Sequence, residues 1–258
     1  MEEVQLHFDG NGVAAPGQLA AMEANEMVAF CLQAIENADL SAPPPAPTSA
    51  KMRYSFTGIE RSAIERKEFY IRWIVAKGLN ELARGVRSTF EEALFYIQGM
   101  KSLSGQMTAD EFNSRIRAIR SRANRFNFPD LVREVNAGLT SPLTFEGEIA
   151  SLQKVRNCLE HRAGVVSAAD VDDAQLLTLH LPRIKAFVYR NNEETELEAG
   201  MHVEGGEPLI FKRVTRTRSY SIGEKVIIDA ADFSEIAFAC NLFAGDVASK
   251  LPTIAAAT

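Results

Sequence analysis

The feature of the sequence that most constrains the fold is the helical periodicity over residues 58–98, the longest such signal in the chain. The apolar residues that recur there at helical spacing are Phe69, Ile71, Trp73, Ile74, Val75, Leu79 and Leu82. Gly78 and Gly85 weaken the helical propensity locally, and residues 88–92 have the spacing of a capping box that would restart the helix. The pattern therefore predicts one long bent helix or two consecutive helices, with Trp73 in the core.

Shorter helical patterns occupy much of the remaining chain. The predicted helices span residues 18–37, 108–126, 129–135, 145–162 and 232–247. Thr108 and Glu111 have the spacing of a capping box, and Asp232 is the predicted cap of the closing helix. Residues 1–17, with three glycines and a proline, predict an irregular start. Residues 41–50 contain four prolines, which predict an extended linker.

The pattern changes after residue 161, where short strands replace long helices. The predicted strands are residues 184–189, 208–215, 218–221 and 225–228, with a turn at Asn191-Asn192. Residues 170–180 fit either a short helix or an irregular connection. The predicted fold is therefore mainly α with a small antiparallel β appendage. It divides into an N-terminal helix with its linker (1–50), a helical bundle (51–182), a β-hairpin appendage (183–230) and a closing helix that packs on the bundle (231–258).

Composition narrows the class of protein. Hydrophobic residues make up 46% and charged residues 24%, as in ordinary globular proteins, and the formal net charge of −6 argues against a general nucleic-acid coat protein. A local basic groove remains compatible with that charge. The three cysteines, Cys31, Cys158 and Cys240, are far apart and predict neither a disulfide framework nor a zinc site. The absence of a signal-peptide pattern and of a long apolar run predicts a cytoplasmic protein without a membrane span.

A separation of polar and apolar residues marks the helix predicted at residues 145–162. With Arg156 at zero on a helical wheel, Asn157 falls near 100° and His161 near 140°. The apolar residues that fall between roughly 200° and 320° are Leu152, Val155, Cys158 and Leu159. One face therefore packs against the protein, while the opposite face presents an arginine, an amide and a histidine together.

These three residue types suit the cleavage of RNA by its own 2′-hydroxyl group. Histidine, with an ordinary pKa of about 6.5, can take the 2′ proton, and the planar guanidinium group of arginine matches phosphate oxygens in pairs. Asn157 can bind a phosphate oxygen or orient the imidazole. The reaction requires no metal and no cofactor. One chain supplies only one such histidine, so this hypothesis requires a two-fold dimer in which a second His161 protonates the leaving oxygen.

A structural role is the alternative for the same residues. Arg156 and Glu160 lie four residues apart and have the spacing of an ordinary surface ion pair. His161, close to the predicted end of the helix, can interact favourably with the helix dipole. In that interpretation the motif stabilises the helix and has no catalytic role.

The sequence from Arg156 to His161 resembles the signature of HEPN (higher eukaryotes and prokaryotes nucleotide-binding) domains, an arginine and a polar residue followed by a histidine. Residues 162–166 are also similar to the sequence that often follows that motif. The resemblance covers residues 52–166 and the closing helix, with the strands as an insertion or an appendage. It implies a helical bundle that forms a homodimer through the motif helix. It also implies an endoribonuclease, commonly a toxin or antiviral effector with a cognate antitoxin or defence partner, although some members do not cleave RNA.

Basic residues outside the motif supply candidate RNA contacts. The helix predicted at residues 108–126 carries five arginines and two acidic residues between Asp110 and Arg125, a local net charge of 5 − 2 = +3. It is interpreted as a solvated face or as a surface that attracts phosphate. The residues predicted to contact RNA are Arg115, Arg120, Arg122, Arg162, Lys212 and Arg213. Basic residues of the strands can instead protect an exposed sheet edge. His180 and His202 lack companions at metal-ligand spacing and are predicted to be structural or exposed.

The leading hypothesis is a metal-independent endoribonuclease with Arg156, Asn157 and His161 as its catalytic residues. The alternative is a non-catalytic dimeric module, either an RNA-binding sensor or a protein-interaction scaffold.

Overall fold

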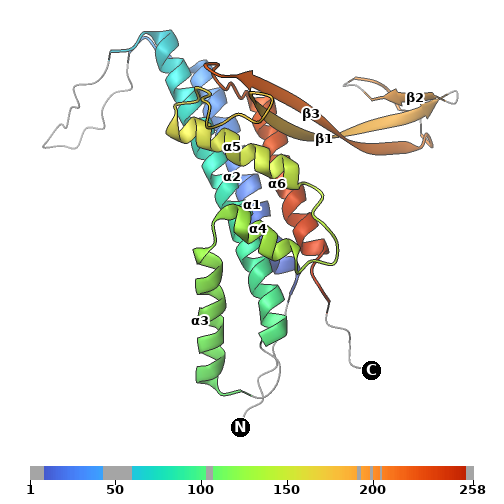
Figure 1. Ribbon diagram of the computed structural model, residues 1–258. Coiled ribbons are helices and arrows are strands. Elements are labelled where there is room, and N and C mark those ends of the chain that lie inside the picture. Colours follow the sequence, from blue (N-terminus) through green and yellow to red (C-terminus); the bar gives the residue numbers. More distant parts are fainter. Residues whose placement is uncertain are drawn as a thin grey trace, which may run out of the picture.

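The computed structural model describes residues 9–42, 60–102, 107–190, 193–197, 200–203 and 205–253. Within them the helices are α1 (Asn11–Asn37), α2 (Ala63–Ser102), α3 (Ala109–Arg125), α4 (Phe128–Asn136), α5 (Glu146–His161) and α6 (Ala230–Ser249). The strands are β1 (Leu176–Arg190), β2 (Glu193–Glu196) and β3 (Leu209–Ser221). The fold is mainly α with a small antiparallel sheet, as predicted (Figure 1). Most of the Pro-rich stretch and the Asn191-Asn192 turn lie outside the described residues.

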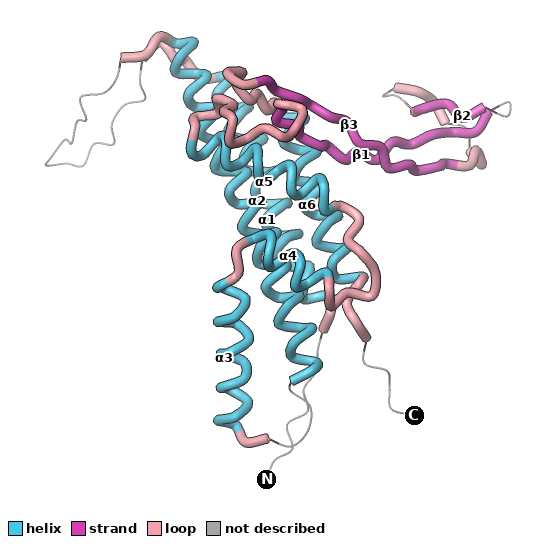
Figure 2. Tube along the Cα trace, in the orientation of Figure 1, coloured by secondary structure: helices cyan, strands magenta, loops and turns pink. Residues whose placement is uncertain are grey.

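Helix α2 is the axis of the molecule, and α1 and α6 pack along it (Figure 1). It is one continuous 40-residue helix, so the alternative of two consecutive helices is excluded. Helix α3 lies beside its C-terminal half, and α4 and α5 cross it (Figure 2). The capping box of Thr108 and Glu111 is confirmed at the start of α3. For α6 the cap is Asp229, three residues earlier than predicted, and Asp232 is the second member of that capping box.

Aromatic and aliphatic side chains of distant segments fill the core. The ring of Phe90 on α2 lies 5.2 Å from that of Phe243 on α6 and 5.6 Å from that of Phe128 on α4. The predicted apolar face of α5 is confirmed, since Leu152, Val155, Cys158 and Leu159 are all buried. This packing fixes which side of α5 faces solvent.

Small residues let α1 and α6 approach α2 closely. A Cβ atom on Gly78 would lie 2.5 Å from side-chain atoms of both Val28 and Phe233, and one on Gly85 would lie 2.4 Å from the Cβ of Ala20. These distances are too short for any side chain larger than hydrogen. The two glycines, which the sequence suggested as weak points of the helix, are instead its closest packing points.

Two predictions about this part of the chain were wrong. Residues 11–17 are not irregular, because α1 begins at Asn11 and contains Pro16. The proline removes one backbone donor, and the N–H of the next residue, Gly17, donates to Thr89 Oγ1 on α2 at 3.0 Å. Trp73 is not in the core but 51% exposed, because the apolar stripe of α2 is wider than the side that α1 and α6 cover.

The sheet has the order β2-β1-β3 and is a long hairpin with a short third strand at its tip. Near α5 and α6 it buries Leu177, Leu179 and Leu181, and its far half extends beyond the helices (Figures 1 and 2). Pro182 has no backbone N–H and so suits a strand edge that has no hydrogen-bonding neighbour. Strand β2 pairs only with Phe187 to Arg190 of β1, which leaves that edge of β1 open at the proline.

The strand predictions were partly wrong. Residues 176–180 belong to a strand, and β3 joins the two strands predicted at 208–215 and 218–221. Residues 225–228 are not a strand, since only Lys225 forms a single bridge, with Val165. Strand β1 also runs through the predicted boundary between residues 182 and 183. None of the described helices is long and apolar enough to cross a membrane.

Candidate functional site

Where α5 crosses α2, one hydrogen-bonded cluster joins Arg156 and Asn157 of the motif to Asn80 and Glu160, and His161 lies at its edge. Arg156 donates from Nε to Asn80 Oδ1 at 2.5 Å and from Nη1 to Asn157 Oδ1 at 3.0 Å. Its Nη2 forms an ion pair with Glu160 Oε2 at 2.6 Å. The Nδ2 of Asn80 donates to Glu160 Oε1 at 3.4 Å, which closes the ring of contacts. The guanidinium group is therefore held in a defined position on the surface.

His161 is the last residue of α5, and its imidazole is the most exposed group of the cluster. The side chain is 60% exposed, compared with 28% for Arg156 and 33% for Glu160. Its Nε2 lies 3.9 Å from Glu160 Oε2, too far for a hydrogen bond but close enough for attraction when the imidazole is protonated. The predicted trio thus lies together, with the imidazole open to solvent.

The charge of this cluster is nearly balanced within one chain, because the carboxylate of Glu160 offsets the guanidinium of Arg156. A guanidinium has five N–H groups, and the contacts described here use three of them. One N–H on each terminal nitrogen is left for a further acceptor. A phosphate that binds Arg156 through these two N–H groups would lie beside the Glu160 carboxylate, whose negative charge opposes the phosphate.

Asn80 is the member of the site that the sequence pattern did not indicate. It lies on α2, 76 positions before Arg156. The only signal in the sequence is an asparagine in the middle of a long helix, where its propensity is poor. Its contact with Arg156 depends on how α5 crosses α2, which local periodicity does not determine.

Arg162, a predicted RNA contact, is bound to a buried acid next to the motif. Its Nε donates to Asp170 Oδ2 at 2.7 Å, and Ser167 donates to the same oxygen from its N–H and its hydroxyl, each at 2.9 Å. Burial acts to raise the pKa of Asp170, but the bonds from Arg162 and Ser167 outweigh it, so the pKa lies below the ordinary value. These bonds fix the turn that follows α5, where Gly164 has a φ of 79°.

The predicted RNA contacts on α3 are also engaged within the chain. Arg120 forms an ion pair with Glu92 at 3.0 Å, and Arg122 forms one with Glu134 at 2.5 Å. Arg115 donates to the carbonyl of Ser102. All three lie on α3 and not on the elements that build the motif cluster, so the structure does not join them to it.

The two predicted contacts on β3 have partners at other places. Lys212 forms an ion pair with Glu194 of β2, and the guanidinium of Arg213 lies 4.7 Å from the ring centre of Phe145. Phe145 caps the N-terminus of α5, at the opposite end of that helix from His161. The strand cations therefore do not extend the motif cluster.

No group of three or more histidine, cysteine, aspartate or glutamate side chains that could hold a metal ion occurs in the described ranges. Comparisons with protein-family models, with curated proteins and with solved structures find no match for this chain.

Proposed function

We propose that this chain is a metal-independent endoribonuclease of the HEPN type, with Arg156, Asn157 and His161 at its active site. The observation that carries the proposal is the position of these three side chains in one cluster at the exposed end of α5, with the imidazole open to solvent. A role as a toxin or defence effector follows from the HEPN resemblance alone.

The reaction needs two histidines, and a two-fold dimer through the motif helix supplies them. His161 of one subunit takes the proton of the 2′-hydroxyl, and the 2′-oxygen attacks the adjacent phosphorus. The bond to the 5′-oxygen breaks, and the protonated His161 of the partner subunit donates its proton to that oxygen. The products are a 2′,3′-cyclic phosphate and a 5′-hydroxyl end. Arg156 binds the phosphate oxygens, on which negative charge accumulates in the transition state.

The direct test is the substitution of His161 by alanine. The measurement is the cleavage of a single-stranded RNA in the presence of EDTA. The His161→Ala protein is expected to lose cleavage, whereas a matched His180→Ala protein retains it, because His180 lies on β1, outside the motif cluster. The circular dichroism spectrum, which reports the fold, and the elution volume in size-exclusion chromatography, which reports the dimer, should be unchanged in both variants. Cleavage by His161→Ala at the wild-type rate would end the assignment.

A second function is favoured by the contacts of Arg156. Because Asn80, Asn157 and Glu160 already hold its guanidinium, the cluster can serve to fix α5 on α2 in a non-catalytic module, an RNA-binding sensor or a protein scaffold. This function predicts that the wild-type protein cleaves no RNA. It also predicts that Arg156→Ala lowers the free energy of unfolding by about 1 kcal/mol, through the loss of these hydrogen bonds. An RNA-binding sensor would in addition show binding that weakens with salt.

A further inference from the structure

Helix α1 exposes large apolar side chains on the side that faces away from the bundle. It buries Val13, Ala14, Gly17, Ala21, Ala24 and Val28 against α2 and α6. Four larger residues remain in solvent: Leu19 is 55% exposed, Met22 63%, Met27 59% and Phe30 66%. We call these four residues the α1 stripe. Isolated exposed apolar residues are common, but a row of them along one helix marks an interaction surface.

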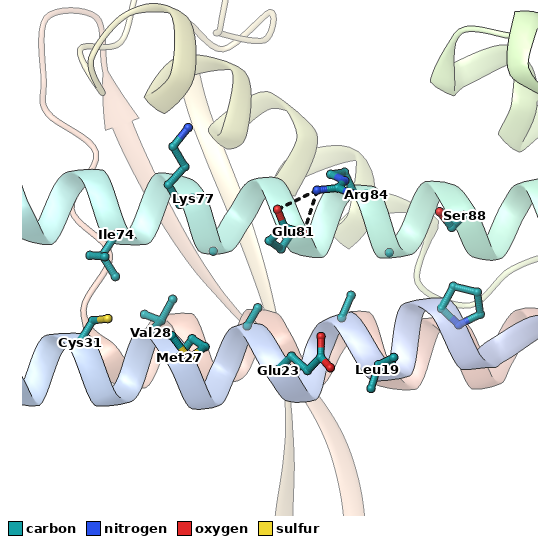
Figure 3. A pocket seen from close by; sticks show the side chains of 15 residues that line it. Leu19, Glu23, Met27, Val28, Cys31, Ile74, Lys77, Glu81, Arg84 and Ser88 are labelled. Carbon is teal, nitrogen blue, oxygen red and sulfur yellow. Dashed lines mark hydrogen bonds and ion pairs between the residues drawn. The ribbon is translucent and has the colours of Figure 1, made fainter.

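The α1 stripe borders a groove between α1 and α2. Figure 3 shows the two helices side by side, with Met27 and Leu19 on one wall and Ile74, Lys77 and Arg84 on the other. The main hollow has a volume of about 520 Å³. A second, apolar hollow continues it towards Trp73. Gly78 and Gly85, which let α1 approach α2 closely, lie in the lining of the groove.

The chemistry of the groove favours a protein ligand. Helix α1 contains no lysine or arginine, and its exposed side carries Glu23 and Glu26 between the apolar residues. A nucleic acid or an anionic lipid surface would be repelled by these carboxylates. On the α2 wall, Lys77 lies over the ring of Trp73. Arg84 forms an ion pair with Glu81, as Figure 3 shows.

The spacing of the α1 stripe is the same in both directions along the helix. Leu19 and Phe30 are equally far from the midpoint between Ala24 and Asn25, and so are Met22 and Met27. At 1.5 Å per residue these distances are about 8 Å and about 4 Å. A two-fold interface requires one surface to complement itself. Two copies of a helix satisfy this requirement when they run antiparallel and the two-fold axis lies at the level of such a midpoint.

We infer that the α1 stripe binds a second copy of this chain, with the two α1 helices antiparallel about a two-fold axis that crosses the exposed side of α1 at the level midway between residues 24 and 25. Leu19 then contacts Phe30 of the partner subunit, and Met22 contacts the partner's Met27. This surface is separate from the motif helix. A chain that also pairs through α5 would form a closed tetramer when the two two-fold axes intersect at right angles. The inference does not depend on the proposed function.

The same register brings Glu23 close to the partner's Glu26, and the symmetry repeats this pair. Substitution of Glu26 by lysine would replace two repulsions with two attractions. For a partly exposed interface the expected result is a dissociation constant lower by about tenfold. This substitution tests the antiparallel register as well as the surface, because a ligand bound elsewhere would not respond in this way.

The experiment is sedimentation equilibrium of the full chain without RNA, at about 1 to 100 µM. The wild-type protein is expected to be a dimer or a tetramer, and Met27→Lys to halve the mass of the assembly. Glu26→Lys is expected to tighten the association. Phe211→Lys is the matched control, since Phe211 is 67% exposed on β3 and lies outside the α1 stripe. Unchanged circular dichroism confirms that each variant is folded.

If the wild-type protein is a monomer at about 100 µM, the inference is overturned. The α1 stripe would then be a binding surface for a protein of different sequence. An unchanged mass for Met27→Lys would overturn it as well. Unchanged or weaker association of Glu26→Lys would reject the antiparallel register. Because RNA is absent from the measurement, failure here is distinct from failure of the nuclease proposal.

Discussion

At the scale of single residues, Glu160 decides how available Arg156 is to a phosphate. Its carboxylate holds the Nη2 group at 2.6 Å and lies 3.9 Å from the imidazole of His161. If the cluster is an active site, the carboxylate competes with RNA for the guanidinium group. If the cluster is structural, the same carboxylate is part of what holds α5 in place. The nuclease proposal therefore predicts that removal of this carboxylate frees Arg156 for RNA. The structural role predicts that its removal weakens the attachment of α5.

Glu160→Gln keeps the size of the side chain and removes its charge. The nuclease proposal predicts RNA binding tighter by several-fold, and cleavage that is retained or faster, because Arg156 loses its competing anion. Fluorescence anisotropy with a labelled RNA measures the first quantity. Glu81→Gln is the matched control, since Glu81 pairs with Arg84 on α2 and is not part of the motif cluster. Weaker RNA binding by Glu160→Gln would count against the phosphate role of Arg156.

Asp170 makes a pH dependence predictable. Its folded-state pKa is lower than the ordinary value, because the bonds from Arg162 and Ser167 outweigh the effect of burial. Stabilisation from a depressed carboxyl pKa is present above the unfolded-state pKa, about 3.9, and is lost as pH falls through the folded value. Urea unfolding should therefore show stability that decreases below about pH 4. Asp170→Asn should reduce that decrease and lower the stability at pH 7. An unaltered pH profile in Asp170→Asn would contradict this role.

At the scale of elements, helical periodicity predicted where helices lie better than which side of them is buried. The spacing of residues 145–162 identified the packed face of α5 correctly, since its large apolar residues are the buried ones. In α1 size separates the two sides instead, because most of the buried residues are small and the large apolar residues face solvent. Close packing of two helices selects small side chains at the contact, so size and not hydrophobicity identifies that face. Trp73 was placed in the core wrongly because it belongs to the apolar stripe of α2 but lies 51% exposed beside the packed side.

The strands show a different limit of sequence reasoning. Residues 225–228 have the composition of a strand, yet in the structure only Lys225 forms a bridge, with Val165 after α5. Pairing depends on which neighbour is available, and this is a property of the tertiary structure. In the same way, Asn80 reaches Arg156 only because α5 crosses α2 at that level.

The glycines of the helices give a paired stability prediction. Gly78→Ala should destabilise the protein by about 1–3 kcal/mol, because its Cβ atom would overlap Val28 and Phe233 at the contact with α1 and α6. Gly147→Ala, in α5, should stabilise it by about 0.5–1 kcal/mol, since no atom lies within 4 Å of the new Cβ and alanine favours the helix. Chemical denaturation of both variants measures the two changes. Equal effects of the same sign would contradict the packing described for α1, α2 and α6.

At the scale of the whole molecule, buried charges join the hairpin to the helical bundle. Arg216 on β3 contacts Asp232 at 2.5 Å and Glu235 at 2.8 Å, and Arg218 contacts Asp232 at 2.6 Å. Asp232 is fully buried at the start of α6. The base of the hairpin is therefore fixed on the bundle, while its far half extends into solvent (Figure 2).

The bundle places two separate features on its surface. Helix α5 presents the motif cluster where it crosses α2. The α1 stripe lies along α1, which packs beside α2. In the proposed arrangement, pairing through the motif helix builds the RNA site, and pairing through α1 determines the size of the assembly. The central claim is that the motif cluster acts on the 2′-hydroxyl group of RNA.

One measurement tests that claim most directly. The wild-type protein is incubated in EDTA with a single-stranded RNA and, separately, with the same sequence in which every 2′-hydroxyl is replaced by hydrogen. We expect the RNA to be cut to products with 2′,3′-cyclic phosphate ends and the 2′-deoxy strand to remain intact. Cleavage of both strands, or of neither, would contradict it.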